Sequence, residues 1–360
     1  EKDRKILQKK LHKATLPKRI NILKQFSTLP QGLEFLVSMR AHCLKYVKTD
    51  NKIKELSEDL KQILIIFFDI GLLDLQQIQW NCPASLLEKL IAYEAVHQIT
   101  SWNDLKNRLD SDRQCFAFFH YKMPNEPLIF VEVALTKVIM KNIHELLDEK
   151  APEVDPNKAT TAIFYSISNT HAGLGGINLG NFLIKRVVDK LTRDYPNLKD
   201  FVTLSPIPGF KKWLDKNLST NYQLISENHK DNLIKNFNDK QISKNDHIND
   251  ILINLLSDNS WVKDQQISQS LMPIMYNLCQ KYLCTVKDNG KVIDPVANFH
   301  LSNGARIEYI NWLANLSEKG MQESYGMMVN YRYILNKIDI NHENYMQKEF
   351  IAKSKNIKYY

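Results

Sequence analysis

Hydrophobic residues recur with two different periods along this chain of 360 residues, and each period predicts a different kind of element. In the first part of the chain the apolar positions are three or four residues apart, as in Leu56, Leu60 and Ile63. Such spacing gives a helix one apolar face. The pattern therefore predicts a helical N-terminal domain over residues 1–75, and then a helix from Ala84 to Ile99.

From residue 115 onward the apolar residues form short runs that are typical of strands. CFAFFHY and LIFVEVALT are separated by KMPNEP, whose prolines and asparagine favour a turn, so a β-hairpin is expected over 115–136. A strand at 160–168 precedes a glycine-rich loop and a helix, and the next strand, FVTL, ends at Ser205. Strand, loop, helix and strand in this order predict that residues 76–360 form a mixed α+β domain.

Composition is ordinary for a globular protein, with 44% apolar and 24% charged residues. No stretch approaches eighteen consecutive apolar residues, so no membrane association is expected. The N-terminus EKDRKILQKK has no apolar core of a signal peptide, and the C-terminus KSKNIKYY lacks a peroxisomal tripeptide. We therefore expect a cytoplasmic protein, although a targeting segment removed upstream of Glu1 would escape notice.

The net charge of +8 is concentrated at one end of the chain. Residues 1–24 hold nine Lys or Arg and two acidic residues, which leaves a net charge near +1 for the rest. A solvated first helix accounts for this cluster, with an arm for a nucleic acid or an anionic surface as the alternative. We expect no nucleic-acid partner, because no zinc finger or RNA-recognition motif is present. Five dispersed cysteines without a CxxC pair predict free thiols and no metal site.

The loop THAGLGGINLG, residues 170–180, follows a predicted strand and opens a predicted helix. Backbone N–H groups at such a position bind phosphate when no side chain obstructs them. The loop is not a P-loop, and GxGxxG from Gly173 fails because residue 178 is Asn. Placed after antiparallel strands, it suggests a site for the pyrophosphate of coenzyme A. Glycines that only cap and turn the chain are the alternative.

Ser205 and His300 are the candidate catalytic residues. In TLSPIPGF two prolines stiffen the chain after Ser205 and fix the direction of its hydroxyl, although SPxP is also a good turn in itself. His300 lies in NFHLSNG, where we expect an extended segment from residue 294 and an Asn-Gly turn at 303–304. An imidazole can deliver a proton near neutral pH. His97, by contrast, is expected to end the helix from Ala84.

Taken together, several stretches resemble the malonyl-CoA decarboxylase family. They are EAVH (94–97), the hairpin 115–136, FYSIS followed by GLGGINLGNFLIKRVV (164–188), LSPIPGF (204–210), NFHLSNGARIEYINWLA (298–314) and GMMVNYRY (326–333). They cover most of residues 80–350 in the order of the family. The joint match is specific, whereas the N-terminal helical part fits by character alone.

The resemblance implies an N-terminal helical bundle that assembles a homo-oligomer, a dimer or a tetramer. It also implies a catalytic domain with the N-acetyltransferase-like (GNAT) α/β fold, which decarboxylates malonyl-CoA to acetyl-CoA and CO2 and requires no cofactor. Ser205 and His300 match the active-site serine and histidine, and Tyr333 matches a supporting tyrosine. Residues that match the coenzyme A segment are Gly173, Gly175, Gly176, Ile177, Leu179, Gly180 and Asn181.

Asn178 departs from the family pattern, which has glutamate at this position. An amide can hydrogen-bond a catalytic group but supplies no charge, so we expect Asn178 to affect the rate. This departure keeps a catalytically impaired coenzyme A-binding relative as one alternative. The other is an acyl-CoA N-acyltransferase of the same fold, which would need an amine site and would not need both Ser205 and His300.

Overall fold

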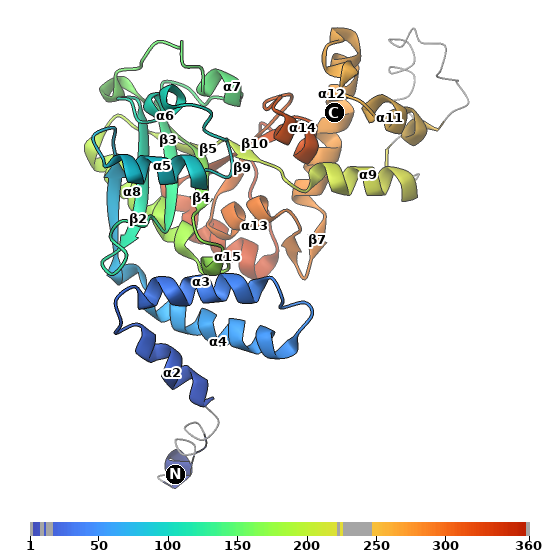
Figure 1. Ribbon diagram of the computed structural model, residues 1–360. Coiled ribbons are helices and arrows are strands. Elements are labelled where there is room, and N and C mark those ends of the chain that lie inside the picture. The colour runs from blue at the N-terminus through green and yellow to red at the C-terminus, as the bar shows by residue number, and fades with distance from the viewer. Residues whose placement is uncertain (1–2, 8–10, 12–16, 222–223, 226–246, 358–360) are drawn as a thin grey trace. The chain divides into compact units, whose positions relative to one another are not determined.

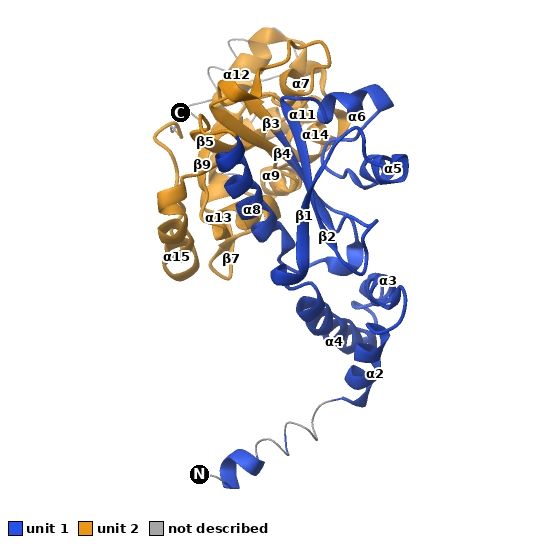
Figure 2. Cartoon of the chain, turned by 90° about the vertical axis from the view of Figure 1, so that its left-hand side faces the viewer, with its two compact units in different colours: residues 1–133, 166–194 blue, residues 134–165, 195–360 orange. Residues whose placement is uncertain are grey.

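The structure is a computed structural model that describes residues 3–7, 11, 17–221, 224–225 and 247–357. Part of the basic segment 1–24 thus lies outside the described residues. The chain divides into two compact units (Figure 2). Unit 1 comprises residues 1–133 and 166–194, and unit 2 comprises residues 134–165 and 195–360. The predicted domain boundary at residue 75 is not the boundary between these two units, and it stays a prediction.

Unit 1 begins with helices and continues into a sheet (Figure 1). Its helices are α2 (Lys18–Phe26), α3 (Gly32–Leu44), α4 (Asn51–Phe67), α5 (Ala84–Tyr93), α6 (Trp102–Arg108) and α8 (Leu179–Asp194). Its strands are β1 (Leu73–Ile78), β2 (Arg113–His120), β3 (Ile129–Thr136) and β4 (Thr161–Asn169), of which β3 and β4 each leave one end in unit 2. A single turn of 3-10 helix, Ala172–Leu174, follows β4.

Unit 2 holds the rest of the sheet and the C-terminal helices. Its strands are β5 (Asp200–Thr203), β6 (Ser205–Pro206), β9 (Arg306–Asn311), β10 (Met328–Tyr333) and the small pair β7 (Lys287–Asp288) and β8 (Lys291–Val292). Its helices are α7 (Ile143–Leu146), α9 (Phe210–Thr220), α11 (Ile248–Leu256), α12 (Gln265–Cys284), α13 (Pro295–Ser302), α14 (Glu318–Ser324) and α15 (Ile338–Lys348).

The predicted hairpin and the predicted strand, loop, helix and strand unit lie within a larger sheet. β1 pairs antiparallel with β2, and the order continues through β3 to β4. β4 then pairs parallel with β5, and α8 is the helix that connects them in the chain. In unit 2 the central strand β10 pairs antiparallel with β5, β6 and β9. The prediction of a helical segment followed by a mixed α+β domain is therefore confirmed.

The core explains why β2 and β3 lack a clean alternation in sequence. Every residue of both strands is buried, so both faces of each strand are covered. On one face, Leu87 and Leu90 of α5 pack against Ala117 and Phe119 of β2. Helix α8 buries Leu183, Val187 and Leu191 along one side, which is the amphipathic pattern that the sequence predicts.

Three expectations about local structure are wrong. The helix from Ala84 ends at Tyr93, because the Glu94 carboxylate accepts hydrogen bonds from the backbone N–H groups of Val96 and His97 and turns the chain. His97 thus lies in a buried turn, not at a helix end. Strand β1 begins inside the segment expected to be helical. Only the two end residues of LDLQQI are buried, so its apolar pattern does not reveal a strand. The third error concerns residues 295–302, which form helix α13 instead of an extended segment.

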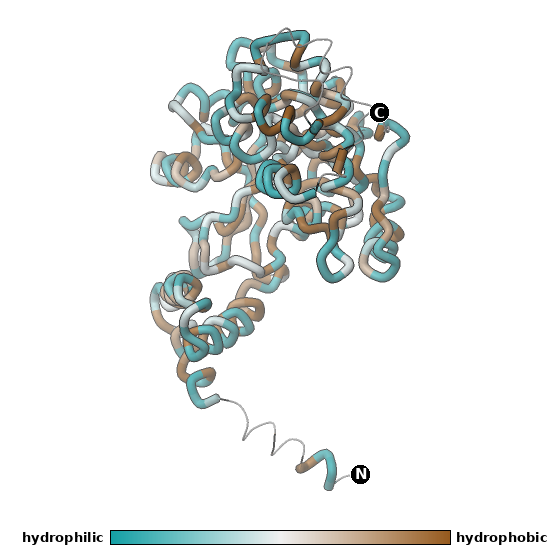
Figure 3. The backbone as a smooth tube through the Cα atoms, turned by 90° about the vertical axis from the view of Figure 1, so that its right-hand side faces the viewer, coloured by the Kyte–Doolittle hydropathy of each residue, from teal (hydrophilic) through white to brown (hydrophobic). Residues whose placement is uncertain are grey.

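The N-terminal helices leave several large apolar side chains in contact with solvent. Hydrophobic and hydrophilic stretches alternate along these helices in Figure 3. Exposed members include Ile22, Phe35, Ile65 and Ile66. None of the helices in the described ranges is long and apolar enough to cross a membrane.

Candidate functional site

Ser205 is held in a strand by the residues that follow it. After Leu204 the chain leaves β5 and forms the two-residue strand β6, in which Ser205 lies opposite Val329 of β10. The side chain is buried, and its hydroxyl donates a hydrogen bond of 2.8 Å to Oγ1 of Thr203. Thr203 Oγ1 also accepts the backbone N–H of Tyr331 at 3.1 Å. The direction of the Ser205 hydroxyl is therefore set by two neighbouring strands.

His300 reaches Ser205 from helix α13. The helix forms because Asp294 caps its N-terminus and Pro295 occupies its first turn, where the missing N–H costs nothing. His300 Nε2 lies 3.2 Å from Ser205 Oγ, and the imidazole stacks on the ring of Tyr331 with centroids 4.6 Å apart. The distance from Ser205 Oγ to Nε2 is within the range for a hydrogen bond between the two groups.

Tyr333 completes this chain of hydrogen bonds. Its hydroxyl lies 2.8 Å from Nδ1 of His300, and burial raises its pKa, so the phenol keeps its proton. When this O–H donates to Nδ1, the proton of the neutral ring is on Nε2, facing Ser205. The order Tyr333, His300, Ser205, Thr203 is then a continuous chain of donors and acceptors.

Burial controls the charge of His300. The side chain is only 3% exposed, and desolvation lowers its pKa to about 3. No carboxylate among the described residues forms a hydrogen bond or ion pair with the ring to oppose this effect. The imidazole is therefore neutral at physiological pH in the free protein.

Asp294 connects the two segments that carry Ser205 and His300. Its Oδ1 accepts the backbone N–H groups of Val296 and Ala297, and its Oδ2 lies 3.3 Å from the hydroxyl of Tyr282. Gly209, in the turn after Ser205, lies close to this carboxylate: a Cβ built there would be 3.8 Å from Asp294 Oδ2, and the backbone N–H of Gly209 acts to lower the pKa of Asp294. Gly209 has to be glycine, since a Cβ there would lie 2.2 Å from the Tyr282 hydroxyl. Burial raises the pKa of Asp294.

The glycine loop belongs to unit 1 and runs from β4 to α8. Gly173 is buried, whereas Gly175 and Gly176 are exposed and Gly176 has a φ of +76°, a conformation that favours glycine. Asn178 is exposed and directly precedes Leu179, the first residue of α8. Exposed glycines before a helix N-terminus give an anion access to backbone N–H groups. The loop has the form that the sequence predicts.

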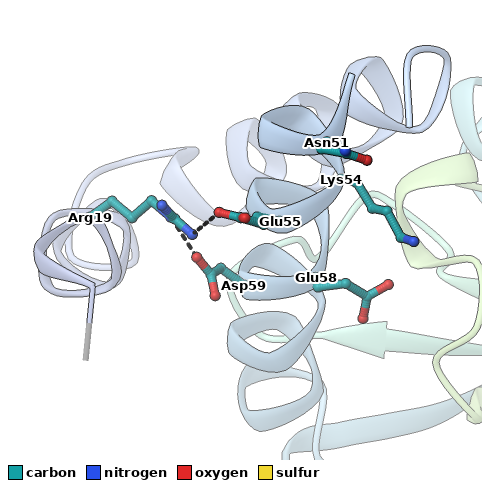
Figure 4. A pocket seen from close by; sticks show the side chains of 6 residues that line it. All are labelled: Arg19, Asn51, Lys54, Glu55, Glu58 and Asp59. Atoms are coloured by element: carbon teal, nitrogen blue, oxygen red, sulfur yellow. Dashed lines mark hydrogen bonds and ion pairs between the residues drawn. The ribbon is translucent and has the colours of Figure 1, made fainter. Parts of the chain in front are cut away.

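A separate cavity of about 500 Å³ lies between α2 and α4 and contains none of the predicted site residues (Figure 4). Arg19 of α2 points toward α4 there, and pairs with Glu55 at 3.5 Å and Asp59 at 2.6 Å. These exposed ion pairs join the two helices and contribute little stability each.

Comparison with known proteins gives a family for the whole chain. Residues 71–360 match the family model for the malonyl-CoA decarboxylase C-terminal domain, and residues 1–68 match the model for its N-terminal domain. This chain belongs to the malonyl-CoA decarboxylase family.

Relatives within this family agree in sequence and in structure. The mitochondrial malonyl-CoA decarboxylase of Rattus norvegicus is 38% identical over 357 residues, which are 97% of this chain and 72% of the rat protein. Crystal structures of malonyl-CoA decarboxylase from Rhodopseudomonas palustris and Agrobacterium vitis are 39% and 41% identical. Each has a TM-score of 0.86, with 97% of this chain and 81% of the other chain covered.

The structure joins three of the four residues that the resemblance to the malonyl-CoA decarboxylase family assigns to catalysis. Ser205, His300 and Tyr333 are linked by hydrogen bonds within unit 2. Asn178 belongs to unit 1, on the loop that contains the predicted coenzyme A residues. The catalytic and binding roles of all these residues stay predictions.

Sequence reasoning missed two residues that hold the candidate site together. Asp294 stands directly before Pro295, and Asp-Pro is a signature of a helix start that could have revealed the cap. Arg40 lies in LVSMRAHCL, an otherwise apolar helical stretch, and its guanidinium is buried against the glycine loop. A charged residue on an apolar helical face was the available signal in that case.

Proposed function

We propose that this chain decarboxylates malonyl-CoA to acetyl-CoA and CO2, with Ser205 and His300 acting on the malonyl group. The chain of hydrogen bonds from Tyr333 through His300 to Ser205 carries the proposal, since it holds a hydroxyl and an imidazole ready to interact with an acyl substrate. Membership of the malonyl-CoA decarboxylase family supports the choice of substrate. The loop Gly173–Asn181 would bind the coenzyme.

In this reaction the bond between the carboxylate carbon and the α-carbon breaks. Its electron pair moves into the thioester as CO2 leaves, and the resulting enolate takes up one proton at carbon. The Ser205 hydroxyl would orient the carboxylate or take part in proton relay, because it can donate a hydrogen bond once it turns from Thr203. His300 would supply the proton to the α-carbon.

The neutral state of His300 in the free protein shapes this step. An anion close to an imidazole favours its charged form and raises its pKa. A malonyl carboxylate bound near Nε2 would thus promote uptake of a second proton at Nδ1, after which the ring can give its Nε2 proton to the enolate and return to the neutral form. The Tyr333 hydroxyl would accept the Nδ1–H of the charged ring and hold the ring in place. Net proton consumption equals one per turnover, as the overall reaction requires.

The test is acetyl-CoA formation from malonyl-CoA by the purified chain and by Ser205→Ala and His300→Ala. We expect each substitution to lower kcat by roughly 10²- to 10⁴-fold, the usual range for general acid catalysis. Ser219→Ala and His42→Ala are matched controls, because both residues are exposed and lie outside the candidate site. Circular dichroism confirms that each variant is folded.

Other outcomes would separate the alternatives. Full turnover in both variants would refute the assigned pair even if the reaction were correct. Coenzyme A binding without turnover by the wild-type chain would favour an impaired relative, and Asn178→Glu would then be expected to restore activity. Transfer of the acyl group to an added amine would favour an N-acyltransferase.

We also propose that the exposed apolar residues of the N-terminal helices form the contact of a homo-oligomer, and that the protein is cytoplasmic. Phe35 and Ile66 are more than half exposed, at 51% and 61%, and large apolar side chains are usually covered by a partner when several occur together. Sedimentation of the wild-type chain beside Phe35→Ser and Ile66→Ser would show whether assembly depends on this segment.

A further inference from the structure

The glycine loop is bound through hydrogen bonds by a buried arginine of the N-terminal helices. Arg40 of α3 is 3% exposed, and its Nη1 donates to the carbonyl oxygens of Gly173 and Gly175, the latter at 2.9 Å. Its Nε donates to the carbonyl of Ser57 in α4 at 3.3 Å. All three segments involved, namely α3, α4 and the loop, belong to unit 1. One guanidinium therefore joins two helices to the loop.

Placing a cation in this position is costly, because burial lowers the pKa of Arg40 and opposes its charge. Arginine nevertheless stays protonated in proteins, and its planar fork suits two acceptors at once. Carbonyl oxygens that point at Arg40 accept strong, charge-assisted hydrogen bonds. The geometry thus fixes the orientation of two peptide groups within the loop.

This orientation determines where the loop can bind an anion. In a planar trans peptide the C=O and the following N–H point in opposite directions. With the Gly175 carbonyl fixed on Arg40, the N–H of Gly176 points away from it. Within the described ranges no hydrogen bond engages that N–H, and both glycines are exposed. A phosphate oxygen is the kind of acceptor that such an N–H binds.

Two further contacts bring the helices to the loop. A Cβ built on Gly173 would lie 2.0 Å from the carbonyl oxygen of Val37 in α3, so only glycine permits this approach. A Cβ on Gly176 would lie 3.4 Å from Nζ of Lys61, a half-buried residue of α4. No hydrogen bond or ion pair of Lys61 occurs among the described residues. Its ammonium group is thus available beside the exposed part of the loop.

We propose that helices α3 and α4 form part of the coenzyme A site, with Arg40 as a positioning residue for the glycine loop and Lys61 as a direct ligand of a coenzyme phosphate. This inference rests on the proposed function, since it assumes that the loop binds coenzyme A. It gives the helical N-terminal segment a role in substrate binding in addition to any role in assembly.

The test compares two substrates that differ only in the coenzyme. Malonyl-CoA carries the phosphates, whereas malonyl-N-acetylcysteamine keeps the thioester and lacks them. We expect Arg40→Ala and Lys61→Ala to raise KM for malonyl-CoA roughly tenfold to a hundredfold, the value of one charge-assisted contact. For the short thioester, kcat/KM should stay within about threefold of wild type. Lys52→Ala, on the exposed side of α4, is the matched control.

Equal losses with both substrates would overturn the proposal, because they would mean that Arg40 only supports the fold. Unchanged KM for malonyl-CoA in Lys61→Ala would overturn the role of Lys61 as a ligand. Should Arg40→Ala not fold, Arg40→Lys serves in its place, because lysine keeps the charge but loses the fork and should still raise KM.

Titration calorimetry keeps this inference separate from the proposed reaction. The Kd of coenzyme A is measured for the wild type and for each variant, beside pantetheine, which lacks the phosphates. If the wild type binds coenzyme A but does not turn over malonyl-CoA, the reaction is wrong and the Kd values still decide the roles of Arg40 and Lys61. A Kd for coenzyme A that is the same in all variants would refute both roles.

Discussion

At His300 two physical effects act on one imidazole. Burial removes the water that would stabilise a cation. The Tyr333 hydroxyl donates to Nδ1 and so leaves the proton of the neutral ring on Nε2. If His300 is the general acid that we propose, it would gain its extra proton in the complex with substrate and not in the free protein. A neutral ring that a nearby anion would charge fits the proposed substrate, which carries a carboxylate.

The charge of His300 can be measured directly by NMR of the chain labelled with 15N-histidine. We expect the ring to stay neutral from pH 8 down to about pH 5, because its pKa is lowered to about 3, with the proton on Nε2. His300→Gln identifies the signals of this residue. Exposed His42 serves as the internal control. Protonation of His300 with a pKa between 6 and 7 would contradict the interpretation of the site.

Among elements, α13 and the turn after Ser205 depend on each other through Asp294. The carboxylate caps the helix that carries His300, and its Oδ2 lies close to Gly209 in the turn. Loss of the carboxylate would release both segments, so the distance of 3.2 Å between Ser205 and His300 would no longer be fixed. Small displacements of this kind reduce catalysis strongly.

We therefore expect Asp294→Ala to lower kcat by at least about tenfold, with a smaller change in KM, and to reduce the free energy of unfolding by about 1–2 kcal/mol. The matched control is Asp264→Ala, because Asp264 caps α12 with the same two backbone bonds but is exposed. The control should lose similar stability without loss of kcat in the folded protein. Equal kcat values for the two variants would contradict a positioning role for Asp294.

Elements were predictable from the sequence where a single local signal dominates. The hairpin of β2 and β3, the strand β4 and helix α8 follow from turn residues and apolar period, and all are present. Helix α13 was not predicted, because its apolar period is weak and its start depends on the cap by Asp294. The end of α5 depends on Glu94, whose carboxylate is itself held by Ser166, 72 residues later in the chain.

The candidate site was predictable in part for the same reason. Ser205 and His300 carry local signals, namely the prolines after one and the Asn-Gly turn after the other. Their contact joins residues 95 positions apart and depends on the pairing of β6 with β10. Spacing in the sequence contains no information on such a pairing, so the geometry of the site needed the structure.

For the whole molecule, two buried groups link stability to pH in opposite directions. Glu132 lies in the core of unit 1, where Arg108 pairs with it at 3.1 Å and with Asp104 at 2.7 Å. Burial, and the nearby Glu94, raise the pKa of Glu132 to about 8. Glu132 is thus protonated near neutral pH, while Arg108 also pairs with Asp104. His300, in unit 2, has a lowered pKa instead.

The sign of each effect follows from which state binds more protons. The folded state holds the Glu132 proton more tightly than the unfolded chain, so this stabilisation is complete below about pH 4.5 and is lost as pH rises toward 8. The folded state excludes a proton from His300, so that stabilisation is complete above about pH 6.5 and is lost as pH falls toward 3. Between about pH 4.5 and 6.5 the two effects oppose each other, and each can be removed by its own substitution.

We expect Glu132→Gln to flatten the loss of stability between about pH 6.5 and 8, because the amide is neutral at every pH and can still accept a hydrogen bond from Arg108. His300→Gln should flatten the loss between pH 6.5 and 4 and leave the alkaline side unchanged. The measurement is the free energy of unfolding by urea at half-unit steps of pH, for both variants and the wild type. If the free energy of unfolding falls equally steeply above pH 6.5 in Glu132→Gln and in the wild type, Glu132 is ionised in the folded protein and is a full partner of Arg108.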